Sequence, residues 1–240
     1  MIIVKNVTKY FGGFQALKNI SFEIGSGEIV GFLGQNGAGK TTLMRILTSY
    51  LPATSGSVVI GGKDIVKNSL AIRGRIGYLS ETPPLYLNMT VRDYLKFAAQ
   101  LKDVAPKLQH TQIDRVLGEC NLGDVQNKTI ATLSKGYKQR VGIAQAIIND
   151  PEVLILDEPT TGLDPVQIIQ VRKLIKNLEY KRTVILSTHI LPEIQQIAKR
   201  VLIIKSGEII VDETVENLLK KFELNLEDVF LKLHSDEENQ

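Results

Sequence analysis

The feature that most constrains the fold of this chain is a glycine-rich segment behind a short apolar run near the N-terminus. Residues 34–41 read GQNGAGKT and fit the template G-x-x-x-x-G-K-[ST] without a mismatch. The apolar run that ends at Gly34 is typical of a buried strand, and residues 42–47 have the pattern of a helix. A strand, a glycine-rich turn and a helix in this order predict a loop that binds phosphate groups.

The residue types in this loop suit that chemistry. Glycines let backbone N–H groups turn towards a polyphosphate, and the following helix presents its positive dipole end to it. Lys40 can reach the β- and γ-phosphates, and the Thr41 hydroxyl can bind Mg²⁺. A turn that merely ends a strand is the alternative, but the complete match favours nucleotide binding. The nucleotide-binding residues expected here are Gly34, Asn36, Gly37, Ala38, Gly39, Lys40, Thr41 and Thr42.

Composition limits the classes of protein to which the chain can belong. Its 240 residues are enough for one domain with a full core, and 43% hydrophobic and 23% charged residues are ordinary for a globular protein. The chain contains no apolar run of the roughly 18 residues that a membrane span needs, and no signal peptide is recognised at its start. A single cysteine, Cys120, suits a reducing compartment, and a net charge of +3 is too small to indicate nucleic-acid binding. We expect a cytoplasmic enzyme with no nucleic-acid partner.

The order of the predicted elements indicates an α/β fold. From about residue 82 to 146 the pattern is helical, with Thr90 as a helix cap, so we expect a helical subdomain inserted between strands. Asp164 and Pro165 begin another helix, and one more is expected at 192–200. Apolar runs predict strands at 2–4, 20–24, 58–64 (with a turn), 75–79, 153–156 and 183–187, and a hairpin at 201–211.

An acidic pair follows the apolar run at residues 153–156. That run is typical of a parallel strand covered on both faces, and ligands bind at the carboxyl ends of such strands. Asp157 would hold Mg²⁺, largely through water, and Glu158 would polarise the attacking water. An acidic pair alone is most often a solvated strand end. Its occurrence with a phosphate loop favours the catalytic interpretation.

Three further segments resemble the motifs of ATP-binding cassette (ABC) proteins. Residues 133–140, LSKGYKQR, resemble the signature motif, and residues 150–165 resemble the Walker B segment and the D-loop. His189 falls where the family has its switch histidine. The resemblance extends over essentially residues 2–233, which implies one ABC ATPase domain over residues 1–233 and a polar tail at 234–240. It implies a P-loop NTPase core with a mostly parallel sheet, an N-terminal antiparallel β part and an inserted helical subdomain at about 82–146.

The resemblance also implies a cycle shared by two cassettes that pair head to tail, most simply as a homodimer. Each ATP would lie between the phosphate loop of one protomer and the signature segment of the other. Ser134 can cap the helix whose N-terminus would face the γ-phosphate there, and Gly136 would let that backbone approach it. Lys40, Glu158 and His189 would form the catalytic set. Asp164, in the D-loop, would link the two sites.

Two more positions complete the expected site. Phe11 aligns with the aromatic residue that stacks on adenine in similar proteins, and Tyr10 is the adjacent alternative. Glu81 stands where the family usually has a glutamine and can approach Mg²⁺ through water, beside Thr41 and Asp157. Its carboxylate adds negative charge near the triphosphate, which would slow or retune hydrolysis.

The signature segment departs from the usual Leu-Ser-Gly-Gly-Gln of the family. Lys135 replaces the first glycine and Tyr137 the glutamine, while Gly136 is kept. Together with Glu81, these departures resemble the export-type subgroup that includes gliding-motility and multidrug ABC transporters. Residues 83–86 and 226–231 are similar to that subgroup as well.

The function implied is the ATP-hydrolysing subunit of an ABC transporter, an exporter by subgroup, whose membrane permease is a separate chain. The protein would then be peripheral, on the cytoplasmic face of the cell membrane. Residues 81–89 would dock a segment of the permease through apolar side chains, unless these only anchor the loop in the core: Leu85, Tyr86, Leu87 and Met89.

Two other functions are compatible with these motifs. One is a soluble, non-transport ABC ATPase that acts on ribosomes or DNA, although the chain shows neither a second cassette, a long insertion nor a basic stripe. The other is a regulator that binds nucleotide without turnover. The carboxylate at Glu81 is compatible with such a regulator. The presence of Lys40, Asp157, Glu158 and His189 favours an enzyme.

Overall fold

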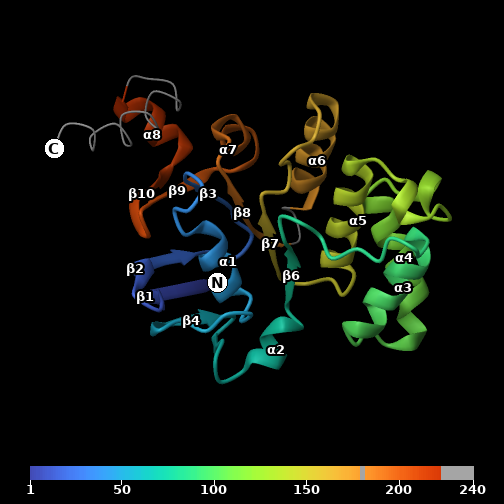
Figure 1. Cartoon of the computed structure of the whole chain (residues 1–240), viewed down its shortest axis with the longest axis horizontal. Helices are drawn as coiled ribbons and strands as arrows, with labels where there is room; N and C mark the ends of the chain where they lie inside the picture. The colour runs from blue at the N-terminus through green and yellow to red at the C-terminus, as the bar shows by residue number, and fades with distance from the viewer. Residues whose placement is uncertain (179–181, 223–240) are drawn as a thin grey trace.

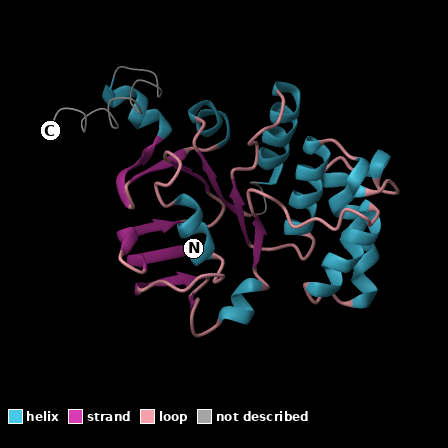
Figure 2. Cartoon of the chain, in the orientation of Figure 1, coloured by secondary structure: helices cyan, strands magenta, loops and turns pink. Residues whose placement is uncertain are grey.

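A computed structural model describes residues 1–178 and 182–222 of the chain, and its strands form two sheets (Figures 1 and 2). The strands are β1 (Ile2–Phe11), β2 (Phe14–Ile24), β3 (Ile29–Leu33), β4 (Ser55–Ile60), β5 (Lys63–Asp64), β6 (Ile76–Leu79), β7 (Val153–Asp157), β8 (Thr183–Thr188), β9 (Arg200–Lys205) and β10 (Glu208–Thr214). The helices are α1 (Lys40–Leu47), α2 (Ser69–Arg73), α3 (Val91–Leu101), α4 (Pro106–Glu119), α5 (Lys135–Ile147), α6 (Pro165–Leu178), α7 (Leu191–Ile197) and α8 (Val215–Phe222), with 3₁₀ turns η1 (Gly123–Val125) and η2 (Ile130–Thr132).

The larger sheet has the order β10-β9-β3-β8-β7-β6, in which all neighbours are parallel except β10 and β9. Every residue of β3, β7 and β8 is buried, which explains why these strands read as continuous apolar runs. The strands predicted at 153–156 and 183–187 are confirmed. Because β3, β8 and β7 are neighbours and parallel, their carboxyl ends meet at one edge of the sheet.

The smaller sheet is antiparallel, with the order β2-β1-β4-β5. Its first two strands form a long hairpin whose register runs from Ile2 opposite Ile24 to Phe11 opposite Phe14. Both strands are much longer than the predicted 2–4 and 20–24. In their outer parts exposed and buried residues do not alternate regularly, so no strand-like apolar pattern marks them. The predicted N-terminal antiparallel part is confirmed.

The large sheet divides the core into two layers. On one face, side chains such as Val30 and Phe32 pack against α1 and the smaller sheet, where Phe32 makes an edge-to-face contact with Phe22 at 5.2 Å. On the other face, Ile29 and Leu33 belong to a cluster that continues into α3, α4, α5, α6 and α7. The α/β class with helices packed on a mostly parallel sheet is thereby confirmed.

The segment between β6 and β7 begins with a loop that precedes its first helix. Residues 82–90 form a loop, because two consecutive prolines at 83 and 84 cannot donate helical hydrogen bonds, and α3 starts only at Val91. Thr90 caps α3 as predicted, accepting from Asp93 N at 3.1 Å. Within residues 1–178 and 182–222, no helix is long and apolar enough to span a membrane.

The C-terminal part contains the predicted hairpin, formed by β9 and β10. The helix predicted at 192–200 ends at Ile197, since Arg200 already pairs with Val30 as the first residue of β9. The last described helix is α8. The sequence pattern predicts helix to about Leu233 in this last segment; its end, the subgroup-like residues 226–231 and the tail 234–240 lie outside the described residues.

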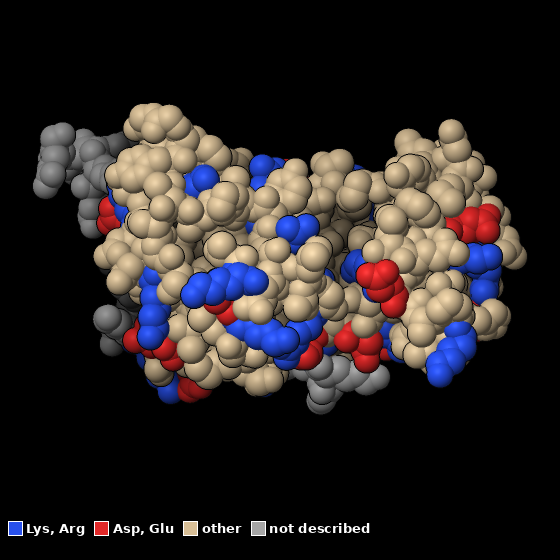
Figure 3. All heavy atoms as spheres, turned by 90° about the horizontal axis from the view of Figure 1, so that it is seen from below, with Lys and Arg blue, Asp and Glu red and all other residues tan. Residues whose placement is uncertain are grey.

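Figure 3 shows the molecule from below, relative to the orientation of Figure 1. Lys and Arg side chains are interspersed there with Asp and Glu side chains, and uncharged residues cover most of the surface. This face therefore presents no continuous field of one sign.

Candidate functional site

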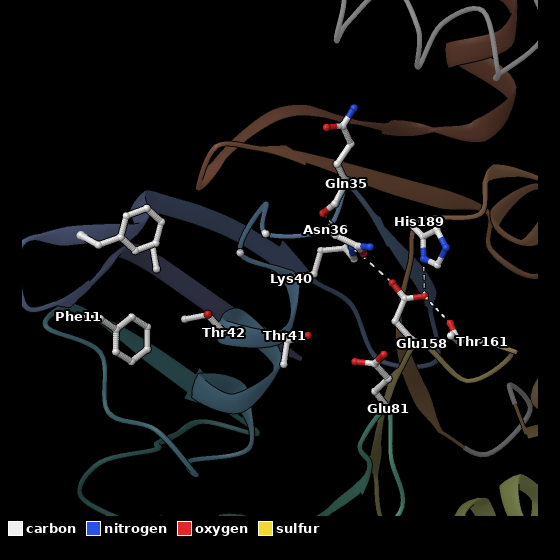
Figure 4. A pocket seen from close by; sticks show the side chains of 14 residues that line it. Phe11, Gln35, Asn36, Lys40, Thr41, Thr42, Glu81, Glu158, Thr161 and His189 are labelled. Carbon is white, nitrogen blue, oxygen red and sulfur yellow. Dashed lines mark hydrogen bonds and ion pairs between the residues drawn. The ribbon is translucent and has the colours of Figure 1, made fainter.

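A cavity of about 640 Å³ opens at the carboxyl edge of the large sheet (Figure 4). The loop after β3, the start of α1 and the β1–β2 hairpin form part of its wall. The loops after β6, β7 and β8 form the rest. The predicted residues that line it are Phe11, Asn36, Gly37, Gly39, Lys40, Thr41, Thr42, Glu81, Glu158 and His189.

The glycine-rich loop is shaped by close backbone contacts. Gly39 has φ +108°, and a Cβ there would lie 2.9 Å from the carbonyl oxygen of Ala16. A Cβ at Gly34 would lie 2.5 Å from the carbonyl oxygen of Ile204. Ala38 is buried, and its carbonyl accepts a hydrogen bond from Gly207 N at 3.0 Å. Gly34 and Ala38 thus support the loop from behind and do not line the cavity. Gly39 both packs against the neighbouring backbone and lines the cavity.

Lys40 is the first residue of α1 and is buried at the floor of the cavity. Its ammonium group donates to the carbonyls of Gly34 at 2.6 Å and Gln35 at 3.1 Å. It also lies 3.4 Å from Oε1 of Glu158. The positive charge and the N-terminal end of α1 therefore face the same space, which makes this part of the cavity suited to an anion.

Asp157 ends β7 and is almost completely buried. Its Oδ1 accepts hydrogen bonds from Ser187 Oγ at 2.5 Å and from Thr41 Oγ1 at 3.3 Å. Its Oδ2 is buried and has no hydrogen-bond partner among the described residues. An unsatisfied carboxylate oxygen beside a hydroxyl group provides the hard oxygen ligands that Mg²⁺ prefers, so these residues fit that ion.

Glu158 follows directly and lines the cavity. Its backbone has φ +50°, and its N–H donates to the backbone oxygen of Ser187 at 3.1 Å. Its Oε2 lies 2.9 Å from His189 Nδ1 and accepts from Thr161 Oγ1 at 3.0 Å (Figure 4). Left-handed backbone at a bulky residue is strained and persists where its surroundings fix it. The strain here orients a carboxylate into a polar cavity.

Glu81 lines the cavity in the loop after β6 and is exposed. Figure 4 shows it on the same side of the cavity as Glu158. The structure thus brings the position that departs from the usual glutamine into the predicted site, with a second carboxylate facing the space in front of Lys40.

The β1–β2 hairpin contributes two phenylalanines. Phe11 lines the cavity as expected, and its cross-strand partner Phe14 lines it too. Both rings are largely exposed, and Lys9 Nζ lies 5.1 Å from the centre of the Phe11 ring. Tyr10, the alternative to Phe11, does not line this cavity. Sequence reasoning missed Phe14; the two glycines after Phe11, typical of a tight hairpin, were the available signal.

The signature segment lies at the start of α5 and does not line this cavity. Ser134 caps α5, accepting from Tyr137 N at 3.4 Å. A Cβ at Gly136 would lie 2.6 Å from the side chain of Gln167 in α6, and a Cβ at Gly162 would lie 2.1 Å from Lys135 Nζ. The signature segment therefore packs closely against the D-loop and α6 of its own chain.

Asp164 caps α6, accepting a hydrogen bond from Gln167 N at 2.9 Å. This is the capping role that its position before Pro165 predicts. The D-loop thus leads directly into a helix that contacts the signature segment. Ser134 and Asp164 are exposed, whereas Gly136 is buried beside Gln167, and none of the three lines the cavity.

Comparisons with known proteins are consistent with one another. The protein-family model described as "ABC transporter" matches residues 17–161. The bacitracin transport ATP-binding protein BcrA of Bacillus licheniformis is 39% identical over 92% of this chain and 72% of its own length. The lantibiotic transport ATP-binding protein SrtF of Streptococcus pyogenes is 35% identical, over 96% of both chains.

Two solved structures share the fold. The ATP-binding cassette MJ0796, as a dimer in a post-hydrolysis state bound to ADP and Pi, superposes with a TM-score of 0.80 at 28% identity and covers 90% of this chain and 99% of its own. The cbiO1 subunit from Clostridium perfringens, part of the ABC transporter complex cbiONQ, superposes with a TM-score of 0.82 at 29% identity. It covers 95% of this chain and 96% of its own.

Proposed function

This chain belongs to the ABC transporter family as an ATP-binding, ATP-hydrolysing subunit, and from this premise we propose how its own residues perform each step. The observation that carries the proposal is the placement of Glu158. Its carboxylate lies between Lys40 and His189, 3.4 Å and 2.9 Å away, at the edge of a cavity walled by a phosphate loop.

The loop set of Gly34, Asn36, Gly37, Ala38, Gly39, Lys40, Thr41 and Thr42 is proposed to hold the phosphates of ATP. Backbone N–H groups and the dipole of α1 would bind the anionic oxygens, and Lys40 would exchange its contact with Glu158 for the β- and γ-phosphates. Phe11 would stack on the adenine, with Phe14 packing beside it. Thr41 and Asp157 would hold Mg²⁺, with Glu81 reaching it through water, and the ion would neutralise charge on the phosphates.

Glu158 is proposed to accept the proton of the attacking water. Two contacts to Oε2, from His189 and Thr161, orient the carboxylate, and the strained backbone directs it into the cavity. Once Lys40 has turned to phosphate, Oε1 is available to the water. His189 is proposed to contact the γ-phosphate from the same side, so that loss of this phosphate is sensed at the end of β8.

The second half of each site is proposed to come from another cassette. Ser134 and Gly136 do not line the cavity of their own chain, which suits a role across an interface. The dimeric structure of MJ0796 supports pairing of this kind. We propose a head-to-tail homodimer in which the α5 N-terminus faces the partner's nucleotide and Asp164 connects the two sites.

The permease is proposed to dock on the loop at residues 81–89. Leu85 and Met89 pack against the core and anchor this loop, whereas Tyr86 and Leu87 are 55% and 50% exposed. The ring of Tyr86 makes an edge-to-face contact with the ring of Phe97 in α3, with 5.2 Å between the ring centres. This contact fixes the position of the Tyr86 ring although the ring is exposed. These two exposed side chains are proposed to contact a permease segment, and the loop then connects that segment to Glu81 in the cavity.

The finer placement of the protein is also part of the proposal. An export-type transporter is supported by the likeness to proteins named for bacitracin and lantibiotic transport, and by the departures at Lys135, Tyr137 and Glu81. Resemblance to the gliding-motility and multidrug group is proposed on the same departures. The protein would lie peripherally on the cytoplasmic face of the membrane, as one domain over 1–233 with a helical subdomain inserted at about 82–146 and a polar tail at 234–240.

A substitution of Lys40 tests the proposal. Lys40→Ala removes the proposed charge-assisted contact to the phosphates of ATP, which contributes roughly 3 kcal/mol. We therefore expect kcat/KM for ATP to fall about a hundredfold. Phosphate release by the purified chain measures it. Lys5→Ala, at an exposed lysine of β1, is the matched control and should keep the wild-type value. Near-wild-type hydrolysis by Lys40→Ala would remove the phosphate loop from the mechanism.

A further inference from the structure

A fully buried acidic side chain, Glu193, lies behind the catalytic pair and outside the nucleotide cavity. Glu193 belongs to α7 and has 0% of its surface exposed. Its Oε2 accepts a hydrogen bond from Thr188 Oγ1 at 2.8 Å, and its Oε1 accepts one from Thr160 Oγ1. Burial of a carboxylate is unfavourable unless its oxygens accept hydrogen bonds. The two threonine hydroxyl groups supply one hydrogen bond to each oxygen and so offset the cost of burying Glu193.

The two threonines belong to the chain segments that carry the catalytic pair. Thr160 follows Glu158 by two residues, and Thr188 ends β8 directly before His189. One carboxylate therefore ties both segments together. The Thr188 hydroxyl also accepts a hydrogen bond from Ile190 N at 3.0 Å, so the backbone on either side of His189 is held.

Contacts to Glu193 reach one more element through Arg172. Its Nη2 lies 3.7 Å from Glu193 Oε1, and its Nη1 donates to Gln196 Oε1 at 2.8 Å. Arg172 belongs to α6, which begins directly after Asp164 of the D-loop and lies beside α7 (Figure 1). The helix that follows the D-loop thus contacts the same carboxylate as the two threonines.

We propose that Glu193 is a positioning residue for ATP hydrolysis, which sets the contact between Glu158 and His189 from behind the site. This inference rests on the catalytic roles proposed above for that pair. Glu193 does not line the cavity, so its loss acts through the geometry of the pair and leaves nucleotide binding intact. A carboxylate suits this role because it only accepts hydrogen bonds and offers one oxygen to each threonine.

The test compares two substitutions of one threonine. Thr160→Val removes the hydroxyl group with little change in volume, and Thr160→Ser keeps it. Misplacement of catalytic groups reduces the rate steeply, so we expect Thr160→Val to lower kcat by about tenfold with KM for ATP changed less than about twofold. Thr160→Ser should recover most of kcat. Gln195→Ala, at an exposed position of α7, is the control and should behave as wild type.

A second measurement separates positioning from a general structural effect. Single-turnover measurements over long times detect the small residual hydrolysis by Glu158→Gln, and this residual rate should not fall further when Thr160→Val is added, because the hydroxyl acts through Glu158. If Thr160→Val does not fold, Glu193→Gln replaces it, since the amide can accept from only one of the two threonines and should also lower kcat selectively. Circular dichroism checks the fold of every variant.

The outcomes distinguish this inference from the proposed function. If Glu158→Gln is inactive while folded Thr160→Val, or its substitute Glu193→Gln, keeps the wild-type kcat, the role of Glu193 is refuted and that of Glu158 stands. An independent, multiplicative loss in the double variant also refutes it. If Glu158→Gln itself hydrolyses ATP normally, the proposed function fails first.

Discussion

The imidazole Nδ1 of His189 lies 2.9 Å from Oε2 of Glu158, across the gap between the ends of β8 and β7. The two strands are adjacent and parallel, so their last residues meet at the edge where the phosphate loop also emerges. A histidine and a carboxylate in contact can orient one another and respond together to a phosphate group. This contact joins the residue proposed to activate water to the residue proposed to sense the γ-phosphate.

Phe11→Ala should weaken ATP binding. Stacking of a base on an aromatic ring contributes about 1–3 kcal/mol, so the Kd for ATP should rise about tenfold, while Phe11→Tyr keeps the wild-type value. Fluorescence titration with a labelled nucleotide measures it. Tyr10→Ala is the control, because Tyr10 is comparably exposed in the same strand and does not line the cavity. A larger loss in Phe14→Ala than in Phe11→Ala would assign the stacking to Phe14 instead.

Glu81→Gln should tighten the binding of ATP in the absence of Mg²⁺. Removal of one negative charge near the triphosphate relieves repulsion of about 0.5–1 kcal/mol at an exposed site, or about threefold in Kd. With saturating Mg²⁺ the difference should shrink, because the ion neutralises the same charge. Glu23→Gln, exposed in β2, serves as the control. Weaker binding by Glu81→Gln without Mg²⁺ would mean that Glu81 does not face the phosphates.

Tyr94→Phe should reduce the loss of stability at alkaline pH. Burial raises the pKa of Tyr94 from 10.0 to about 12. Between these values the unfolded chain releases a proton that the folded protein keeps, so stability falls as the pH rises from 10 to 12, by about 2–3 kcal/mol for this group.

Chemical unfolding at several pH values measures this effect. Tyr94→Phe should flatten the fall between pH 10 and 12, and should cost about 1 kcal/mol at neutral pH, where its hydroxyl donates to Pro84 O at 3.3 Å. Tyr50→Phe, at a ring 77% exposed, is the matched control. If the free energy of unfolding falls between pH 10 and 12 as steeply in Tyr94→Phe as in the wild type, folding does not raise the pKa of Tyr94.

Much of the site was predictable because it depends on local patterns. A glycine-rich template between a strand and a helix determines the phosphate loop, so Lys40 and Thr41 were found from spacing alone. The apolar strand before Asp157 placed the acidic pair at a sheet edge, since parallel strands align their carboxyl ends. Resemblance to a family then selected His189, which local pattern could not distinguish from a structural histidine.

Other parts could not be read from local patterns. Phe14 becomes a neighbour of the cavity only through the register of a hairpin whose outer residues follow no regular apolar pattern. Glu193 reads as an ordinary acid near the start of a helix, and its burial follows from three segments that are distant in sequence. The change to helical character was predicted from about residue 82, whereas the prolines at 83 and 84 prevent a helix there and the first helix starts after the predicted cap Thr90.

The most direct test of the account is the mass of the protein in solution with ATP and Mg²⁺, with Glu158→Gln measured beside the wild type. Glu158→Gln should bind ATP without hydrolysing it, and should therefore accumulate as a dimer of twice the chain mass. The wild type should return to the monomer as ATP is consumed. A Glu158→Gln variant that turns over ATP at the wild-type rate, or that stays monomeric at high concentration with ATP bound, would contradict the proposed paired-cassette cycle.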